Sequence, residues 1–163
     1  MADQFIHMET SQGPVRIKLR PDLAPNHVER ITSLAKAGEY DGVVFHRVID
    51  GFMAQTGDVQ HGKGSNTSMA GTGGSSKPDL KQEFSGEPHK RGTCSMARTA
   101  DPDSANSQFF ICFDDTPHLD RQYTVWGEVV DGMDNVDKLE KGSGSGGSVS
   151  DPDKIVSMTV VEE

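Results

Sequence analysis

The alternation of apolar and polar positions along the chain predicts short β-strands. Between residues 15 and 19, Val15, Ile17 and Leu19 alternate with two basic residues. This is the pattern of a strand with one buried face. Comparable strand patterns occur at residues 5–8, 45–48, 52–55, 92–96, 108–113, 123–130 and 155–160. The chain is therefore expected to be mainly β.

Two other segments carry apolar residues at the helical spacing. In the first, Asn26 is the expected N-cap and Gly38 the expected end. In the second, Gly142 closes the helix. The apolar stripes consist of Val28, Ile31, Leu34 and Ala35 in the first helix, and of Met133, Val136 and Leu139 in the second.

The order of these elements indicates a fold class and a domain count. Residues 61–76 are small, polar and without periodicity, as in a linker. A domain boundary there would leave neither side with a complete core, so we interpret residues 1–163 as a single domain. Many short strands with two helices predict a closed antiparallel β-barrel.

Composition narrows the classes of partner. The chain has 163 residues, 33% hydrophobic content, 18 glycines and a formal net charge of −9 at pH 7. This charge disfavours nucleic acid, because phosphate binding needs clustered Lys and Arg. The chain starts without a signal-peptide pattern, and no apolar run approaches the ~18 residues of a membrane helix. Cys94 and Cys112 lack CxxC or metal spacing and are expected to be reduced and structural. We expect a cytoplasmic monomer with no membrane partner.

The candidate chemistry is concentrated in residues 45–58, FHRVIDGFMAQTGD. Arg47 is permanently charged and offers a rigid fork of donors. If the first four of these residues form a strand, Phe45 and Arg47 point to the same face. A turn and a second strand then carry Phe52 and Gln55. The stretch predicts an apolar pocket with a guanidinium at its edge, although its apolar residues would also fit an ordinary core.

A second motif occurs at residues 95–113, SMARTADPDSANSQFFICF. Together the two stretches resemble the cyclophilins, peptidyl-prolyl cis-trans isomerases with an FHR-x-I-x-GFM-x-Q-x-GD block and a later SQFFI-type block. The resemblance runs from about Gln4 to about Val160. It implies a mainly β fold, a closed eight-stranded antiparallel β-barrel capped by two α-helices. It also implies rotation of X-Pro bonds to assist protein folding, with proline-containing polypeptides as partners.

Several shorter motifs are incomplete. Residues 57–63 match the first seven positions of a phosphate-binding P-loop, but Gly64 stands where Ser or Thr is needed. Residues 142–147 contain GxGxxG, yet they follow a helix rather than a strand. Asn66 begins a glycosylation sequon that is idle in a protein that is not secreted. The sequence has no G-x-S-x-G elbow and no paired histidine spacing of a zinc site, so neither a metal nor another cofactor is expected.

By position, the resemblance assigns roles to individual residues. Arg47 corresponds to the catalytic arginine, which would stabilise the twisted amide, and Gln55 to the glutamine that anchors the substrate backbone. Gly71, Thr72 and Gly73 match a loop that borders the neighbouring subsite. The implied proline-pocket walls are Phe52, Met53, Phe110 and Leu119, of which the last two would also fit an ordinary core, and the implied peptide contacts beside them are Ala97 and Gln108.

Three departures from the family pattern affect ligand preference. Arg98 stands where many eukaryotic members have Asn, and one residue is inserted between Ala97 and Gln108. His118 and Tyr123 replace a Trp and a His along the pocket rim. The resemblance implies that cyclosporin-type cyclic peptides occupy the same groove, so we expect this protein to bind them weakly. A proline-peptide-binding or holdase module with incidental catalysis is the alternative function.

Overall fold

A computed structural model of the chain describes residues 3–63, 69–142 and 146–162. Within these residues, eight antiparallel strands form one sheet in the order β3-β4-β6-β5-β7-β2-β1-β8. The strands are β1 (Gln4–Thr10), β2 (Gly13–Leu19), β3 (Arg47–Ile49), β4 (Met53–Thr56), β5 (Thr93–Met96), β6 (Phe109–Cys112), β7 (Val125–Asp131) and β8 (Ile155–Glu162). The helices are α1 (Pro25–Lys36), α2 (Met133–Asp137) and the 3-10 helix η1 (Pro117–Leu119).

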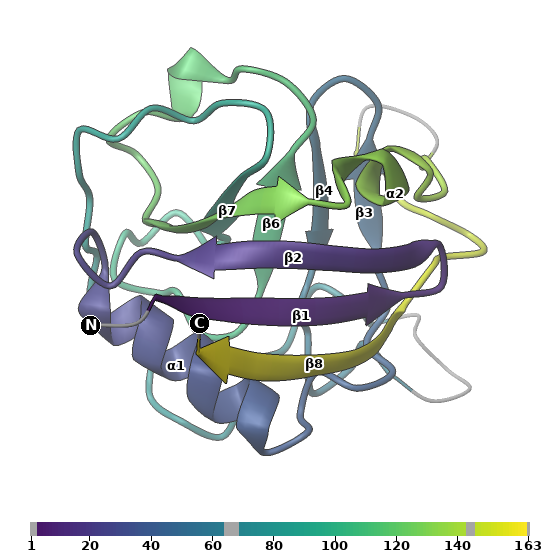
Figure 1. Ribbon diagram of the computed structural model, residues 1–163, viewed down its shortest axis with the longest axis horizontal. Coiled ribbons are helices and arrows are strands. Elements are labelled where there is room, and N and C mark those ends of the chain that lie inside the picture. The colour runs from purple at the N-terminus through teal and green to yellow at the C-terminus, as the bar shows by residue number, and fades with distance from the viewer. Residues whose placement is uncertain (1–2, 64–68, 143–145, 163) are drawn as a thin grey trace.

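The sheet curls into an open half-barrel, so the prediction of a closed barrel is wrong. Figure 1 shows β8, β1 and β2 in front, with β3 and β4 running across them behind. In the described part of the chain, no ladder joins β3 to β8, the two ends of the sheet. The outer edge of β3 is covered instead by a loop, through a bridge from Arg47 to Ser148 and a 2.8 Å bond from the Val48 N–H to the Gly147 carbonyl. Because β3 has only three residues and this loop covers its outer edge, β8 cannot pair with that edge of β3.

Strand β2 shows why the alternation of the sequence was informative. Val15, Ile17 and Leu19 are at most 2% exposed, whereas Arg16 and Lys18 between them are partly exposed. Burying such an aliphatic side chain contributes about 1.5–3 kcal/mol. A slip of one residue would expose all three, so the pattern fixes the register of β2 between β1 and β7.

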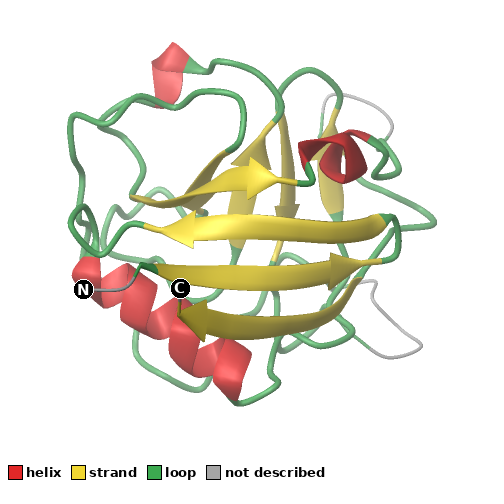
Figure 2. Cartoon of the chain, viewed as in Figure 1, coloured by secondary structure: helices red, strands yellow, loops and turns green. Residues whose placement is uncertain are grey.

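Helix α1 begins one residue before the cap expected from the sequence. Pro25 occupies the first turn and Ala24 the cap position, without a side-chain cap bond, so the prediction of Asn26 as N-cap is wrong. The cap comes from a distant residue, because the Glu83 carboxylate accepts the Asn26 N–H at 3.3 Å and the His27 N–H at 2.9 Å. Figure 2 shows α1 and the short α2 at opposite sides of the molecule.

Helix α2 is shorter than its apolar stripe indicated. It ends at Asp137 rather than near Gly142. Val136 and Leu139 are nevertheless both 1% exposed. The predicted stripe is thus buried at Val136 and Leu139 and partly buried at Met133, whereas the predicted length of the helix is wrong.

In the part of the chain that the structure describes, the buried apolar side chains form two separate clusters. The larger one fills the half-barrel and includes Trp126, whose ring meets Phe109 edge-on at 5.3 Å. Cys94 and Cys112 are buried free thiols, as expected. The smaller cluster consists of Met53, Phe110, Cys112 and Leu119, contributed by β4, β6 and η1. This smaller cluster is the floor of the candidate site.

Three sequence motifs fall partly or wholly outside the described residues. They are the eighth P-loop position, Gly64, the sequon at residues 66–68, and residues 143–145 of the GxGxxG match. Among the described helices, none has the length and apolar character needed to cross a membrane.

Candidate functional site

Arg47 and Gln55 face each other across the β3–β4 hairpin. The antiparallel register pairs them directly, and Gly51, with φ of +75°, turns the chain between the two strands. Arg47 Nη1 donates to Gln55 Oε1 at 3.1 Å, and Arg47 Nε donates to the Gly146 carbonyl at 3.0 Å. The guanidinium is therefore held at two points by bonds that use two of its five donors.

The strand expected to begin at Phe45 begins at Arg47 instead. Phe45 is fully buried in the larger cluster, and its N–H donates to the Asp153 carbonyl at 2.8 Å. The condition under which Phe45 and Arg47 would share one strand face, a strand that begins at Phe45, is therefore not met. The aromatic side chains that line a pocket together with Arg47 are Phe52, Phe110 and Tyr123.

A small pocket of about 120 Å³ opens beside the guanidinium. Met53, Phe110 and Leu119 form its floor and are each at most 8% exposed. Tyr123 meets the Phe110 ring edge-on at 5.6 Å. The lining of this small pocket consists of Arg47, Phe52, Met53, Gln55, Ala97, Arg98, Phe110, Leu119 and Tyr123. An apolar floor with one cation at the edge suits a compact apolar group attached to a polar one.

A relay of side-chain hydrogen bonds continues from Arg47 away from the small pocket. Because Arg47 donates to Gln55 Oε1, Gln55 Nε2 is the group that donates to Gln108 Oε1, at 3.0 Å. Gln108 Nε2 then donates to the Gly73 carbonyl at 2.9 Å. The cation thus determines the orientation of both amides, since a flip of either would place two donors or two acceptors together.

The loop at the end of this relay is held by a buried carboxylate. Asp58 is fully buried and accepts the N–H groups of Gln60 at 3.0 Å, and of His61, Gly71 and Gly73 at 2.8 Å each. Burial by itself would raise the pKa of Asp58, but the four N–H donors outweigh it and lower that pKa below its ordinary value. Asp58 therefore fixes the loop that contains Gly71 and Gly73.

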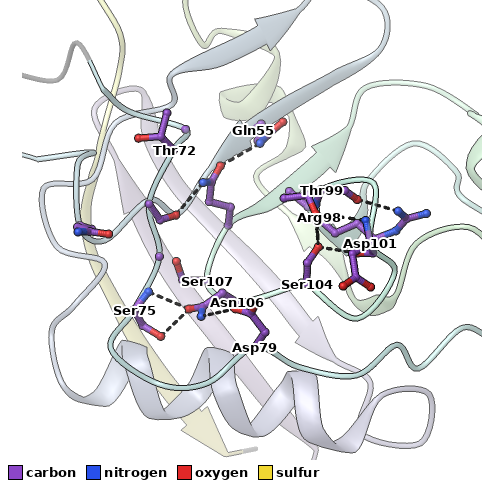
Figure 3. A pocket seen from close by; sticks show the side chains of 16 residues that line it. Gln55, Thr72, Ser75, Asp79, Arg98, Thr99, Asp101, Ser104, Asn106 and Ser107 are labelled. Carbon is purple, nitrogen blue, oxygen red and sulfur yellow. Dashed lines mark hydrogen bonds between the residues drawn. The ribbon is translucent and has the colours of Figure 1, made fainter.

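A larger polar cavity of about 550 Å³ adjoins the small pocket and shares Gln55, Ala97 and Arg98 with it. Figure 3 shows Thr72 and Ser75 on one side of this polar cavity, and Thr99, Asp101 and Ser104 on the other. The remaining lining is Gln60, Gly71, Gly73, Gly74, Asp79, Asn106, Ser107 and Gln108. Its walls are hydroxyls, amides and carboxylates, so it suits a polar group rather than an apolar one.

The rim of the small pocket has a distinct set of contacts. The His118 ring lies 5.5 Å from the Phe52 ring, tilted by 34°. The Arg98 guanidinium lies 4.6 Å from the centre of the Tyr123 ring and donates to the Gln122 carbonyl at 2.7 Å through Nη2. Arg98 is thus tied to the rim beside Tyr123.

The structure brings the residues expected from the sequence into one region. Nine of them line the small pocket. Four others, Gln108, Gly71, Thr72 and Gly73, line the polar cavity. His118 lines neither cavity and contacts the rim through Phe52. Phe110 and Leu119 are buried in the smaller cluster and also line the small pocket, so packing in a core cluster and a place in the pocket are both observed for them.

Sequence reasoning missed the residues that organise the polar cavity. Asn106 Oδ1 accepts both the N–H and the hydroxyl of Ser75, at 2.8 and 2.6 Å, and Asn106 Nδ2 donates to Asp79 at 3.0 Å. Asp58 and Asn106 lie within the two recognised motifs, at residues 45–58 and 95–113, but their partners lie in loops without periodicity. Membership of the motifs was therefore the signal available for them.

Comparisons with known proteins cover nearly the whole chain. Residues 5–160 match the sequence model of the family described as Cyclophilin type peptidyl-prolyl cis-trans isomerase/CLD. A probable peptidyl-prolyl cis-trans isomerase of Brucella suis is 57% identical over 162 residues, which are 97% of this chain and 83% of that protein. A peptidyl-prolyl cis-trans isomerase-like 3 of Gallus gallus is 40% identical over 139 residues, which are 83% of this chain and 81% of that protein.

Solved structures give the same match. A cyclophilin from Hirschia baltica superposes with a TM-score of 0.81 at 26% identity, over 99% of this chain and 82% of its own. A cyclophilin type isomerase of Cryptosporidium parvum, crystallised in the presence of the dipeptide Ala-Pro, has a TM-score of 0.80 at 24% identity and covers 98% of this chain and 99% of its own. The latter likeness concerns the fold.

Proposed function

Because the chain belongs to the cyclophilin-type peptidyl-prolyl cis-trans isomerases, we propose that it accelerates X-Pro rotation by binding the twisted amide between Arg47 and the small pocket. Amide resonance imposes a barrier of about 18–20 kcal/mol on this rotation. No covalent bond to the substrate has to form or break. A site therefore accelerates the reaction by binding the twisted amide better than either planar form.

Arg47 is the group that we propose supplies this preference. In the twisted amide the prolyl nitrogen becomes pyramidal and regains a lone pair, which a donor can then bind. A charge-assisted hydrogen bond contributes about 1.5–3 kcal/mol, or roughly tenfold to a hundredfold in rate. The observation that carries the proposal is the guanidinium fixed to Gln55 and Gly146 at the edge of a pocket with an apolar floor.

The remaining acceleration is assigned to binding and orientation. We propose that the proline ring occupies the small pocket against Phe52, Met53, Phe110 and Leu119, and that Gln55 binds the substrate backbone. Ala97, Gln108 and the loop at Gly71, Thr72 and Gly73 would contact the residues before proline, where the polar cavity begins. Holding one side of the amide while the other rotates lowers the entropic part of the barrier.

The test is an isomerisation assay on a short X-Pro peptide, by NMR exchange or protease coupling. We expect activity in the wild type and a loss of at least about tenfold in kcat/KM for Arg47→Ala. Arg91→Ala is the matched control, because Arg91 is an exposed arginine paired with Asp137 away from the small pocket. An unchanged rate in folded Arg47→Ala would refute the role of Arg47. Peptide binding without turnover in the wild type would favour the holdase alternative.

Several wider expectations stay predictions. They are assistance to protein folding, a cytoplasmic location, a single domain over residues 1–163, a monomeric state, and the absence of a nucleic-acid partner. The family match over residues 5–160 supports the single domain. Acceleration of a proline-limited refolding reaction, measured with Arg47→Ala as the inactive comparison, would test folding assistance.

A further inference from the structure

A buried histidine lies next to the Phe110 wall of the small pocket. His89 precedes β5, and its side chain is fully buried. Its ring is stacked on Phe110, with centroids 6.3 Å apart and planes 18° apart. Ser95 on β5 is the direct cross-strand neighbour of Phe110 on β6. His89 and Ser95 together therefore support the side chain that closes the small pocket.

The orientation of the His89 ring is fixed by a carboxylate at one nitrogen. Asp120 Oδ1 accepts the backbone N–H of His89 at 2.7 Å and lies 3.2 Å from His89 Nδ1. An ionised carboxylate only accepts hydrogen bonds, so this contact assigns the proton to Nδ1.

The second ring nitrogen, Nε2, faces a hydroxyl. It lies 3.0 Å from Ser95 Oγ, and the Ser95 hydroxyl donates to the Thr124 carbonyl oxygen at 2.9 Å. Both nitrogens of the buried ring therefore have a polar neighbour within 3.2 Å, and these two contacts restrict the orientation of the ring.

We propose that His89 is a positioning residue of the isomerase, held by Asp120 and Ser95 so that its ring sets the place of Phe110 in the pocket wall. This inference rests on the proposed function, in which the small pocket binds the proline ring. In that proposal Phe110 packs against the proline ring of the substrate in both the planar and the twisted forms of the amide. Loss of its support is therefore expected to raise KM and to leave kcat nearly unchanged.

The fold contains a matched control for this arrangement. At the start of α1, Glu83 Oε1 accepts the backbone N–H of His27 at 2.9 Å and lies 2.6 Å from His27 Nδ1. His27 is also fully buried, but its Nε2 has no hydrogen-bond partner among the described residues, and neither His27 nor Glu83 lines the small pocket. One motif therefore occurs twice, once beside the pocket wall and once away from it.

The experiment compares His89→Ala and Ser95→Ala with His27→Ala in the full chain. His89→Ala removes the imidazole ring but keeps both hydrogen bonds of the His89 backbone to the residues that flank η1. In these bonds the backbone N–H donates to Asp120, and the carbonyl accepts the Thr116 N–H at 2.9 Å. We expect KM for a short X-Pro peptide to rise about threefold to tenfold in His89→Ala and less in Ser95→Ala, with kcat within about twofold of wild type. The NMR resonances of the Phe110 ring should shift in both variants.

His27→Ala should lose thermal stability while KM and the Phe110 resonances stay at their wild-type values. If His89→Ala does not fold, Ser95→Ala carries the test, since it removes only one oxygen atom. Unchanged KM and unchanged Phe110 resonances in the variants that fold would overturn the proposal, as would equal KM changes in His89→Ala and His27→Ala. If the wild type does not isomerise the peptide, the proposed function is refuted. The Phe110 resonances of the variants would still show whether His89 determines the position of Phe110.

Discussion

At the scale of single residues, the direction of the Arg47–Gln55–Gln108 relay has a measurable consequence. Gln108→Met removes the acceptor of Gln55 Nε2 and the donor to the Gly73 carbonyl, and it keeps the volume of the side chain nearly the same. The net worth of a typical hydrogen bond is about 0.5–1.5 kcal/mol. We therefore expect kcat/KM to fall about twofold to tenfold, which is less than in Arg47→Ala. Gln12→Met, whose side chain bonds Asp153 away from the site, should leave kcat/KM unchanged in the same assay.

The rim residue His118 gives a second prediction at this scale. Its imidazole is exposed and its ring lies 5.5 Å from the Phe52 ring, and it offers a bound cyclic peptide less area than an indole would. At about 25 cal/mol per Å², a deficit of several tens of Å² weakens binding by roughly 1–2 kcal/mol. We expect His118→Trp to bind cyclosporin about tenfold more tightly than the wild type in a calorimetric titration. Equal affinities, or tighter binding by the wild type, would contradict the area argument.

The sequence identified the residues of the small pocket because most of them lie in two long contiguous motifs; Leu119 and Tyr123 follow the second motif. Phe52, Met53 and Gln55 follow Arg47 within one hairpin, so motif and pocket coincide. The polar cavity was less accessible to sequence reasoning. Its organising residues, such as Asn106, act through loops whose partners are distant in the sequence and show no periodicity.

At the scale of elements, the loop that contains Gly71 and Gly73 depends on one side chain. In Asp58→Asn, an amide N–H₂ replaces one of the two carboxylate oxygens that together accept four backbone N–H groups. A buried donor left without a partner costs about 1–3 kcal/mol. We expect a loss of unfolding free energy of this size in urea, and faster hydrogen exchange at the Gly71 and Gly73 amides. Asp103→Asn, at an exposed position, is the control and should change neither quantity.

Elements were predictable where burial alone determined them. The alternation in β2 and the stripe in α1 both correspond to buried faces. The cap of α1 was missed because it comes from Glu83, more than fifty positions along the chain. The closed barrel was wrong because nothing in the short β3 sequence shows that residues near Ser148 cover its outer edge. Contacts between distant segments therefore decided the features that periodicity did not.

At the scale of the whole molecule, burial of neutral imidazoles links stability to pH. Burial lowers the pKa of His27, His46 and His89 below the ordinary value, despite the opposing carboxylates Glu83, Asp58 and Asp120. Folding therefore favours the neutral form of these three rings. The lowered pKa values of Asp58 and Asp120 act in a separate, more acidic range, because unfolded carboxyl groups titrate near pH 4.

The last prediction follows from the sign of this linkage. A histidine whose pKa is lower in the folded state binds more protons when unfolded, so its contribution is complete above the unfolded pKa of about 6.5 and is lost as the pH falls below it. Each such ring changes the unfolding free energy by up to about 1.4 kcal/mol per pH unit in this range. Urea unfolding at about pH 7.5 and about pH 5.5 should therefore show lower stability at the acidic value. His27→Gln removes one of the three rings, so the unfolding free energy of this variant should change less between the two pH values. An unfolding free energy of the wild type that is equal at both pH values would show that the buried imidazoles are not neutral.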